Sequence, residues 1–147
     1  MQKKRFMADT NVFIAAFKSG YTVTTKLLLK LLLDPEVELI VDDILLKEYD
    51  RWFKTLSEKI PKIREQAELL YTLIKAKAKL EYPSNDDINK VKQYLPETKT
   101  ADIYHAATCL KANCILITND NDFQELKRAG VVEVWTISEA VRKLLKL

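Results

Sequence analysis

Acidic side chains recur in this sequence where an apolar run ends. The run RFMA is followed by Asp9, and the run VELIV is followed by Asp42. The run CILIT is followed within four residues by Asp120 and Asp122. Carboxylates gathered in one place repel one another and raise each other's pKa unless a cation joins them. Their oxygens suit hard divalent cations such as Mg²⁺ and Mn²⁺, so the pattern favours an acidic metal site.

Two further acids lie in segments with helical spacing. Glu48 follows Asp43 by about one and a half helical turns, and Asp102 lies in the first turn of the helix before CILIT. Each acid taken alone also fits a turn, a helix cap or a solvated helix face. The cluster contains no His or Cys pattern of the kind that zinc prefers. Together the acids favour Mg²⁺ or Mn²⁺.

Apolar runs and helical spacings alternate along the chain. The runs predict strands at 5–9, 37–41, 79–83, 114–118 and 131–136. The spacings predict helices at 11–17, 22–33, 43–56, 60–79, 85–94, 99–113, 122–129 and 139–146, the last capped by Ser138. This alternation predicts parallel βαβ units in a three-layer α/β/α sandwich with a central parallel sheet of four to five strands. Ligands of such sheets bind beyond the carboxyl ends of the strands, where the acids lie.

The length and composition fit one globular domain over residues 1–147. The chain is 48% apolar and 31% charged, and its two Gly leave little room for long linkers or a turn-rich β-sandwich. The net charge of +3 is too small to prove a nucleic-acid partner, although 24 Lys and Arg can form a local basic face. Cys109 and Cys114 lie in apolar runs, which predicts buried free thiols in a reducing compartment.

The chain contains no signal for a membrane. No apolar run reaches the roughly 18 to 20 residues that a membrane span needs. The basic start MQKKRF has no apolar stretch of signal-peptide type behind it. We therefore expect a cytoplasmic protein with no membrane partner.

Carboxylate-bound Mg²⁺ or Mn²⁺ can hydrolyse a phosphodiester. One or two such ions lower the pKa of a bound water and stabilise the leaving oxygen. The protein then needs only well-placed carboxylates and a basic surface for the polynucleotide backbone. The sequence offers no convincing protein nucleophile, which fits this chemistry.

Two segments resemble the motifs of the PIN domain (PilT N-terminus) ribonucleases. ADTNVFIAAF at 8–17 resembles the first motif, in which a strand ends on Asp and is followed by Thr or Ser, Asn and an apolar helix. ADIYHAATCLKANCILITNDNDF at 101–123 resembles the C-terminal block of Asp, an Ala-rich helix, an apolar strand and Thr-x-Asp. Between them, Glu48 stands where the family usually places a glutamate. The resemblance covers almost the whole chain.

The resemblance implies a Mg²⁺- or Mn²⁺-dependent endoribonuclease that acts on RNA. It implies four catalytic, metal-binding acids: Asp9, Glu48, Asp102 and Asp120. Asp122 would be an accessory acid, as a ligand or just behind the ligands. Supporting hydrogen bonds would come from Thr10, Asn11 and Thr118.

The resemblance also implies partners, and alternatives stay open beside it. Many stand-alone domains of this size are VapC-type toxins, held inactive by a small antitoxin protein and commonly homodimeric. The main alternative is a catalytically silent RNA- or protein-binding module on the same scaffold. A phosphohydrolase of the haloacid-dehalogenase type is disfavoured, because the second Asp that it needs is replaced by Asn11.

Three other features have two interpretations each. Asp42 and Asp43 can add a metal ligand or cap the helix at 43, and we favour the cap. His105 is the only histidine; a half-buried helix residue is favoured over a catalytic base. The basic residues of the helices from 43 to 79 fit a solvated face or an RNA clamp. The clamp would be formed by Arg51, Lys54, Lys62 and Arg64.

Overall fold

The computed structural model describes residues 3–18 and 20–146 and contains a parallel sheet within them. Its strands are β1 (Lys4–Ala8), β2 (Val37–Val41), β3 (Ala78–Leu80), β4 (Ile115–Ile117) and β5 (Val134–Trp135). The order is β3-β2-β1-β4-β5, and every pairing is parallel. In β1, Phe6 pairs with Leu39 on one side and with Ile115 on the other. The sheet therefore reverses its order at β1, which lies at its centre.

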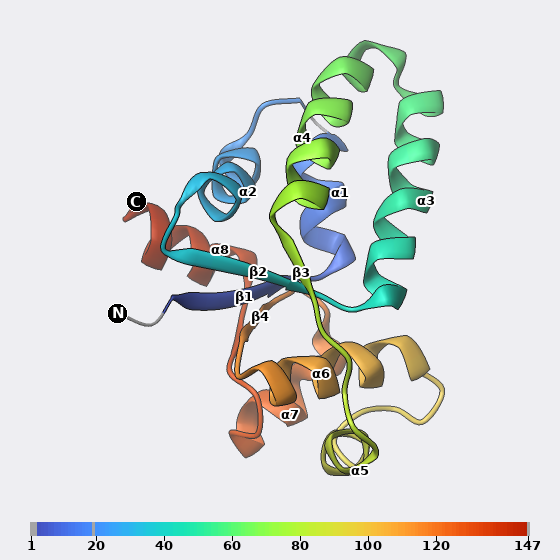
Figure 1. Cartoon of the computed structure of the whole chain (residues 1–147), viewed down its shortest axis with the longest axis vertical. Coiled ribbons are helices and arrows are strands. Elements are labelled where there is room, and N and C mark those ends of the chain that lie inside the picture. The colour runs from blue at the N-terminus through green and yellow to red at the C-terminus, as the bar shows by residue number, and fades with distance from the viewer. Residues whose placement is uncertain (1–2, 19, 147) are drawn as a thin grey trace.

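The helices cover both faces of this sheet. They are α1 (Thr10–Lys18), α2 (Val23–Leu33), α3 (Asp43–Lys59), α4 (Arg64–Lys77), α5 (Asn85–Lys92), α6 (Thr100–Ala112), α7 (Gln124–Ala129) and α8 (Ile137–Ala140). The first four lie on one face together with α8, and α5, α6 and α7 lie on the other (Figure 1). The predicted three-layer α/β/α architecture is thus confirmed. In the described part of the chain, no helix combines the length and apolarity that crossing a membrane requires.

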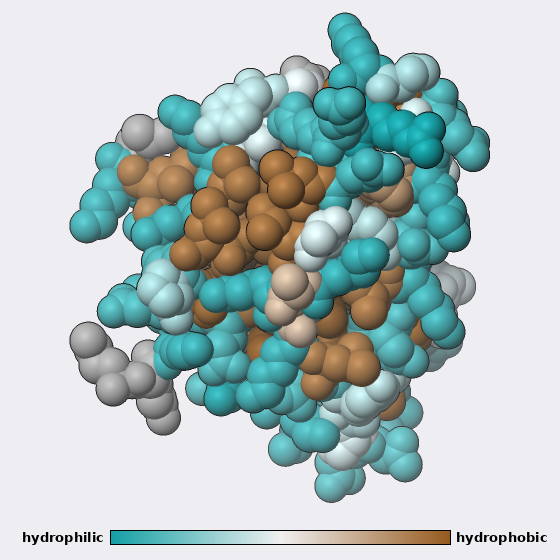
Figure 2. Space-filling model, turned by 45° about the horizontal axis from the view of Figure 1, so that its top comes forward, coloured by the Kyte–Doolittle hydropathy of each residue, from teal (hydrophilic) through white to brown (hydrophobic). Residues whose placement is uncertain are grey.

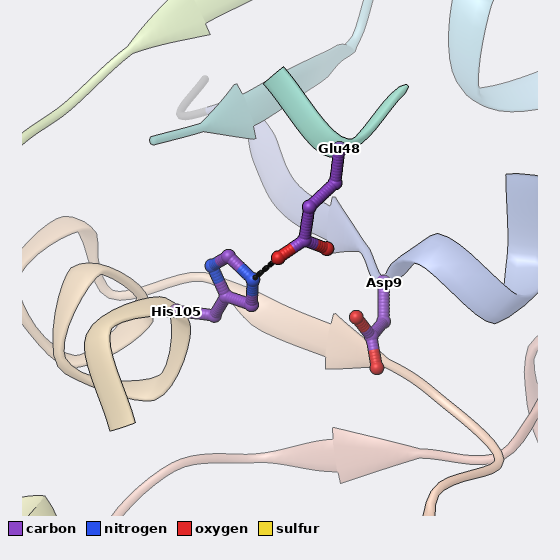
Figure 3. A group of neighbouring side chains, drawn as sticks. All are labelled: Asp9, Glu48 and His105. Carbon is purple, nitrogen blue, oxygen red and sulfur yellow. Dashed lines mark hydrogen bonds and ion pairs between the residues drawn. The ribbon is translucent and has the colours of Figure 1, made fainter. Parts of the chain in front are cut away.

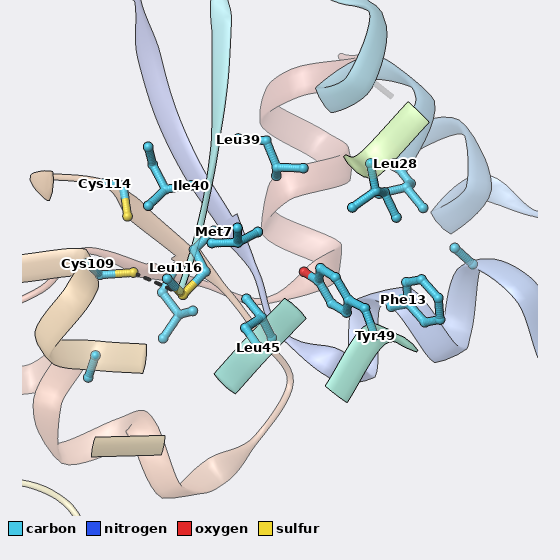
Figure 4. Packing of buried hydrophobic residues seen from close by; sticks show 14 of the residues in the cluster. Met7, Phe13, Leu28, Leu39, Ile40, Leu45, Tyr49, Cys109, Cys114 and Leu116 are labelled. Atoms are coloured by element: carbon cyan, nitrogen blue, oxygen red, sulfur yellow. Dashed lines mark hydrogen bonds between the residues drawn. The ribbon is translucent and has the colours of Figure 1, made fainter. Parts of the chain in front are cut away.

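The core lies between the sheet and these helix layers (Figure 4). Phe6 and Met7 of β1 are both fully buried, because neighbouring side chains of a strand point to opposite faces and both faces are covered. The ring of Tyr49 stacks on Phe13 at 4.9 Å between centroids, and its hydroxyl donates to the carbonyl of Ala8. This bond ties α3 to the end of β1, directly before the first acid.

The two cysteines are free and buried, as expected. The Cys109 thiol lies 3.6 Å from the sulfur of Met7 in β1 (Figure 4). Cys114 is 4% exposed and directly precedes β4. Both thiols thus fill space between α6 and the sheet.

Several predicted boundaries differ from the structure, and two of the differences have a clear local cause. The last helix begins at Ile137 and is capped by Thr136, not by Ser138. Thr136 has an extended backbone, and its hydroxyl accepts the backbone N–H of Glu139 in a capping box. The helix predicted at 60–79 is also shorter, because Pro61 opens a 3₁₀ turn and the non-helical Ile60 before it separates this turn from α3.

Candidate metal centre

The acids meet at the carboxyl edge of the sheet. Asp9 directly follows β1, Asp42 follows β2, and Asp120 comes three residues after β4. β1 is the strand at which the order reverses, the place where ligands bind in parallel sheets. Two groups of three residues could each hold a metal ion. Each residue of a group offers one ligand atom, and the three atoms of the group lie within 4.8 Å of one another. The two groups are Asp9 with Glu48 and His105, and Asp102 with Asp120 and Asp122.

Asp9 is almost fully buried and accepts hydrogen bonds on both carboxylate oxygens. Its Oδ1 accepts the backbone N–H of Thr10 at 2.8 Å. Its Oδ2 accepts the hydroxyl of Thr118 at 2.8 Å and the side-chain amide of Asn11 at 3.2 Å. Burial raises the pKa of Asp9, and the bonds from Thr118 and Thr10 offset part of this rise. The carboxylate is therefore fixed in orientation by three donors.

Glu48 reaches the same edge from the second turn of α3 (Figure 3). One carboxylate oxygen accepts the hydroxyl of Thr10, and the other lies 3.2 Å from Nε2 of His105. Burial by itself raises the pKa of Glu48, but the hydrogen bonds from His105 and Thr10 outweigh it. The net pKa of Glu48 is lowered, so this carboxyl is ionised at neutral pH.

The second group joins the start of α6 to the turn after β4. The backbone N–H of Asp120 donates to the Thr118 hydroxyl at 3.1 Å, and that of Asp122 donates to Oδ1 of Asp120 at 2.9 Å. Burial, and then the charges of Asp9 and Asp120, raise the pKa of Asp102 to about 6. Burial and the neighbouring carboxylates therefore disfavour the ionised form of Asp102.

This donor set fits a hard divalent cation. The second group consists of oxygen donors alone, which is the preference of Mg²⁺ and Mn²⁺. Burial and nearby negative charge raise the pKa of Asp102, and a bound cation would neutralise that charge. Lys99 lies 3.7 Å from Asp122 at the rim and neutralises part of that charge.

His105 differs from the expectation of a half-buried residue, because only 1% of it is exposed. Its Nδ1 lies 2.6 Å from Oδ2 of Asp42, and its Nε2 faces Glu48. Asp42 also caps α3, since its Oδ1 accepts the backbone N–H of Leu45 at 2.7 Å, which confirms the predicted cap. The contact between Asp42 and His105 joins residues 63 positions apart, and no local pattern in the sequence signals it.

The basic residues considered for RNA binding are spread along the α3–α4 hairpin. Lys62 and Arg64 lie at its tip, beyond the end of α3, and the 11 residues of α3 that follow Glu48 span about 16 Å of helix (Figure 1). Lys54 pairs with Asp50 at 2.9 Å. Arg51 lies nearer the acids, since its charge contributes to the lowered pKa of Glu48. Of the four, the structure brings only Arg51 toward the acidic edge.

Comparisons with known proteins place this geometry in a family. Among solved structures, the fold is similar to VapBC-1 from nontypeable Haemophilus influenzae, at 20% identity and a TM-score of 0.60, over 91% of this chain and 98% of that one. It is also similar to VapBC2 from Rickettsia felis bound to a DNA fragment from their promoter, at 18% identity and a TM-score of 0.61, over 90% and 98%. No curated protein matches the sequence. Residues 6–129 match the model of the PIN domain, and the chain therefore belongs to the PIN domain family.

Proposed function

We propose that this chain is a metal-dependent endoribonuclease that hydrolyses RNA phosphodiester bonds at its acidic edge with Mg²⁺ or Mn²⁺. One observation carries the proposal. Carboxylate oxygens of Asp102, Asp120 and Asp122 lie within 4.8 Å of one another, although burial and the charges of Asp9 and Asp120 raise the pKa of Asp102 to about 6. Such an arrangement costs stability unless a cation is bound, and membership of the PIN family supports the nuclease class.

Each residue of the edge has a role in this proposal. The proposed metal ligands are Asp9 and Glu48 of one group and Asp102, Asp120 and Asp122 of the other, around one or two ions. When bound, the ion supplies Lewis acidity, which lowers the pKa of water and stabilises the leaving oxygen. Thr118 and Asn11 hold the carboxylate of Asp9, and Thr10 holds that of Glu48. Arg51, exposed on α3, is placed to contact the RNA backbone.

The proposal is tested by RNA cleavage with purified, EDTA-treated protein. Cleavage should be absent without metal, return with Mn²⁺ or Mg²⁺, and fall at least about 100-fold in Asp9→Asn, which loses a charged ligand. Asp86→Asn is the matched control, because it removes an exposed carboxylate that lies outside both acidic groups. Wild-type protein that binds Mn²⁺ and RNA without cutting would instead support a catalytically silent binding module.

A small antitoxin protein is the proposed partner. Support comes from the two similar solved structures, which are both VapBC assemblies. The partner should be encoded by a short reading frame next to this gene. Its co-expression should abolish cleavage by wild-type protein, and cleavage that persists in a purified complex would contradict this partner.

A homodimer is the proposed assembly. Figure 2 shows a contiguous apolar area over α2 and α4. Leu33 of α2 and Leu69 of α4 are 63% and 61% exposed, although apolar side chains of this size are usually covered. Sedimentation should give a dimer for wild-type protein and a monomer for Leu33→Lys. A wild-type monomer at all concentrations would contradict this assembly.

The proposed site of action is the cytoplasm. Cys109 and Cys114 are free thiols inside the core, a use of cysteine that suits a reducing compartment. A thiol assay of protein taken from cells should find both cysteines reduced.

A further inference from the structure

Lysine side chains gather at the amino ends of the strands, at the end of the sheet opposite the acidic edge. They line a hollow of about 490 Å³ that is formed by the start of β1, the end of α2 and the π-helical segment Val141–Leu145 after α8. In Figure 1 these segments lie together on the left, and β1 runs from them toward the acids. The lysines of the hollow are Lys3, Lys4, Lys30, Lys143 and Lys146.

Positive charge dominates this hollow, although two acids also line it. Asp34 forms an ion pair with Lys30 at 2.9 Å, so these two charges neutralise each other. Glu36 is the second acid. The other four lysines face this one carboxylate, which leaves an excess of three positive charges. Within the part of the chain that the structure describes, none of these four lysines forms an ion pair.

A second hollow, of about 440 Å³, lies at the same end of the sheet on the side of α6. Lys3 and Lys4 line it too, together with Arg5, whose charge is paired with a glutamate of β2 at 3.6 Å. The acid of this hollow, Glu133, accepts the indole N–H of Trp135 at 2.7 Å. The lysines at the start of β1 therefore present positive charge to both hollows.

Lys143 is oriented by an aromatic ring. Its ammonium group lies 4.9 Å from the centre of the Trp135 ring, and cation–π attraction favours this position. Trp135 also lines the second hollow, so Lys143 stands where the two hollows approach each other. We call the surface formed by Lys3, Lys4, Lys143 and Lys146 the amino-edge surface.

The chemistry of this surface favours a polyanion. Among the described residues, no large exposed apolar side chain lines either hollow, although such side chains are typical of the core of a protein interface. Lysines that contact phosphates release counterions, and this release is the main source of affinity for a nucleic-acid backbone. The acidic edge repels the same phosphates, so an RNA needs positive charge elsewhere on the protein.

We propose that the amino-edge surface binds the phosphate backbone of the RNA substrate outside the segment that is cut. The inference rests on the proposed function for the identity of the ligand. The five residues of β1 separate this surface from Asp9 by about 16 Å, so one RNA chain can contact both ends of the sheet only if it extends at least that far.

The first test measures RNA binding in EDTA, without the ion of the acidic edge. The probe is a fluorescent single-stranded RNA of about 20 nucleotides, and the readout is anisotropy at several salt concentrations. Lys4→Gln combined with Lys143→Gln removes two of the proposed phosphate contacts. The slope of log affinity against log salt should become shallower by about 1.4, because each contact to a single strand contributes about 0.7. Affinity at 0.1 M salt should then fall by about 25-fold.

Two further pairs of substitutions make this result specific. Lys3→Gln combined with Lys146→Gln should give the same loss, which guards against a folding defect in one pair. Lys90→Gln combined with Lys92→Gln is the matched control, because it removes the same charge from α5, outside both hollows. The control should bind RNA like wild type. An equal loss in all three pairs shows an effect of net charge alone and overturns the proposal, as does unchanged binding in both amino-edge pairs.

Cleavage of the same RNA with Mn²⁺ separates this inference from the proposed function. The amino-edge pairs should raise KM and leave kcat nearly unchanged, because their contacts are the same before and during the reaction. Wild-type protein that binds RNA through these lysines without cutting it overturns the proposed function and leaves the amino-edge surface intact. Wild-type protein that cuts RNA while both amino-edge pairs keep its KM overturns this inference alone. Binding in EDTA to vesicles of phosphatidylserine and phosphatidylcholine, but not to RNA, also overturns it, by making the surface a membrane contact.

Discussion

The hydroxyl of Thr118 donates to Oδ2 of Asp9 at 2.8 Å, although the two residues are 109 positions apart. Asp9 follows β1 and Thr118 follows β4, and these strands are neighbours where the sheet order reverses. The same hydroxyl accepts the backbone N–H of Asp120 at 3.1 Å. One hydroxyl group thus sets the position of an acid from each of the two acidic groups.

Replacing Thr118 by Val should weaken metal binding. Loss of the hydroxyl raises the already raised pKa of Asp9 further, so a proton competes better with the ion. We expect Mn²⁺ affinity at pH 7 to fall by about 10-fold, measured by calorimetry. Thr118→Ser keeps the hydroxyl and is the matched control. If Val and Ser variants bind Mn²⁺ equally, the hydroxyl does not position the acids.

Asp102→Asn should stabilise the metal-free protein. The carboxyl has an ordinary pKa of 3.8 and a pKa of about 6 in the fold, so its ionised form is disfavoured there and stability is lost as the pH rises from 3.8 through about 6. The shift corresponds to about 3 kcal/mol, which solvent screening of this half-buried group reduces to about 1 kcal/mol. The measurement is urea unfolding at pH 8 with EDTA.

With Mn²⁺ added, wild type should become more stable than Asp102→Asn, because the ion stabilises only the protein that binds it. Asp86→Asn is the control for loss of a carboxylate. A metal-free Asp102→Asn that is less stable than wild type would show that the acids do not repel one another as the geometry indicates.

The pH dependence of stability should report His105. Its pKa rises from 6.5 to about 10 on folding, so its contribution is complete below 6.5 and is lost as the pH rises to about 10. Between pH 6.5 and 8 the free energy of unfolding should fall by about 1.5 kcal/mol through this group. Urea unfolding of wild type and His105→Gln at several pH values, both in EDTA, isolates the contribution of His105. If the free energies of unfolding of the two proteins change with pH in parallel, the raised pKa of His105 is refuted.

Much of the order of elements was predictable because the central strands contain short apolar runs covered on both faces. VELIV and CILIT predict β2 and β4 in this way. The acids that come after these runs mark the carboxyl ends of the strands, where ligands of parallel sheets bind. The boundary near Thr136 was less predictable, because Ser138, the second residue of the real helix, is an equally plausible cap by residue type.

The contacts of the site were not predictable in the same way. The position of Asp42 before a helix predicts that it caps the helix, as it does. The same local pattern does not predict its contact with His105. That contact depends on how α6 packs against the start of α3, which is tertiary packing between distant segments. The spread of the basic residues along α3 and α4 likewise depends on where the hairpin turns.

The central claim is that the acidic edge hydrolyses RNA by activating water, and the chemistry of the product ends tests it most directly. Attack of water breaks one P–O bond and leaves one solvent oxygen on the terminal phosphate, whereas attack of the ribose 2′-hydroxyl gives a 2′,3′-cyclic phosphate. Mass spectrometry of products formed in ¹⁸O-water with Mn²⁺ should find one ¹⁸O on each new terminal phosphate, no cyclic phosphate, and no product with EDTA. Cyclic phosphate ends, or equal cleavage with EDTA, would contradict the claim.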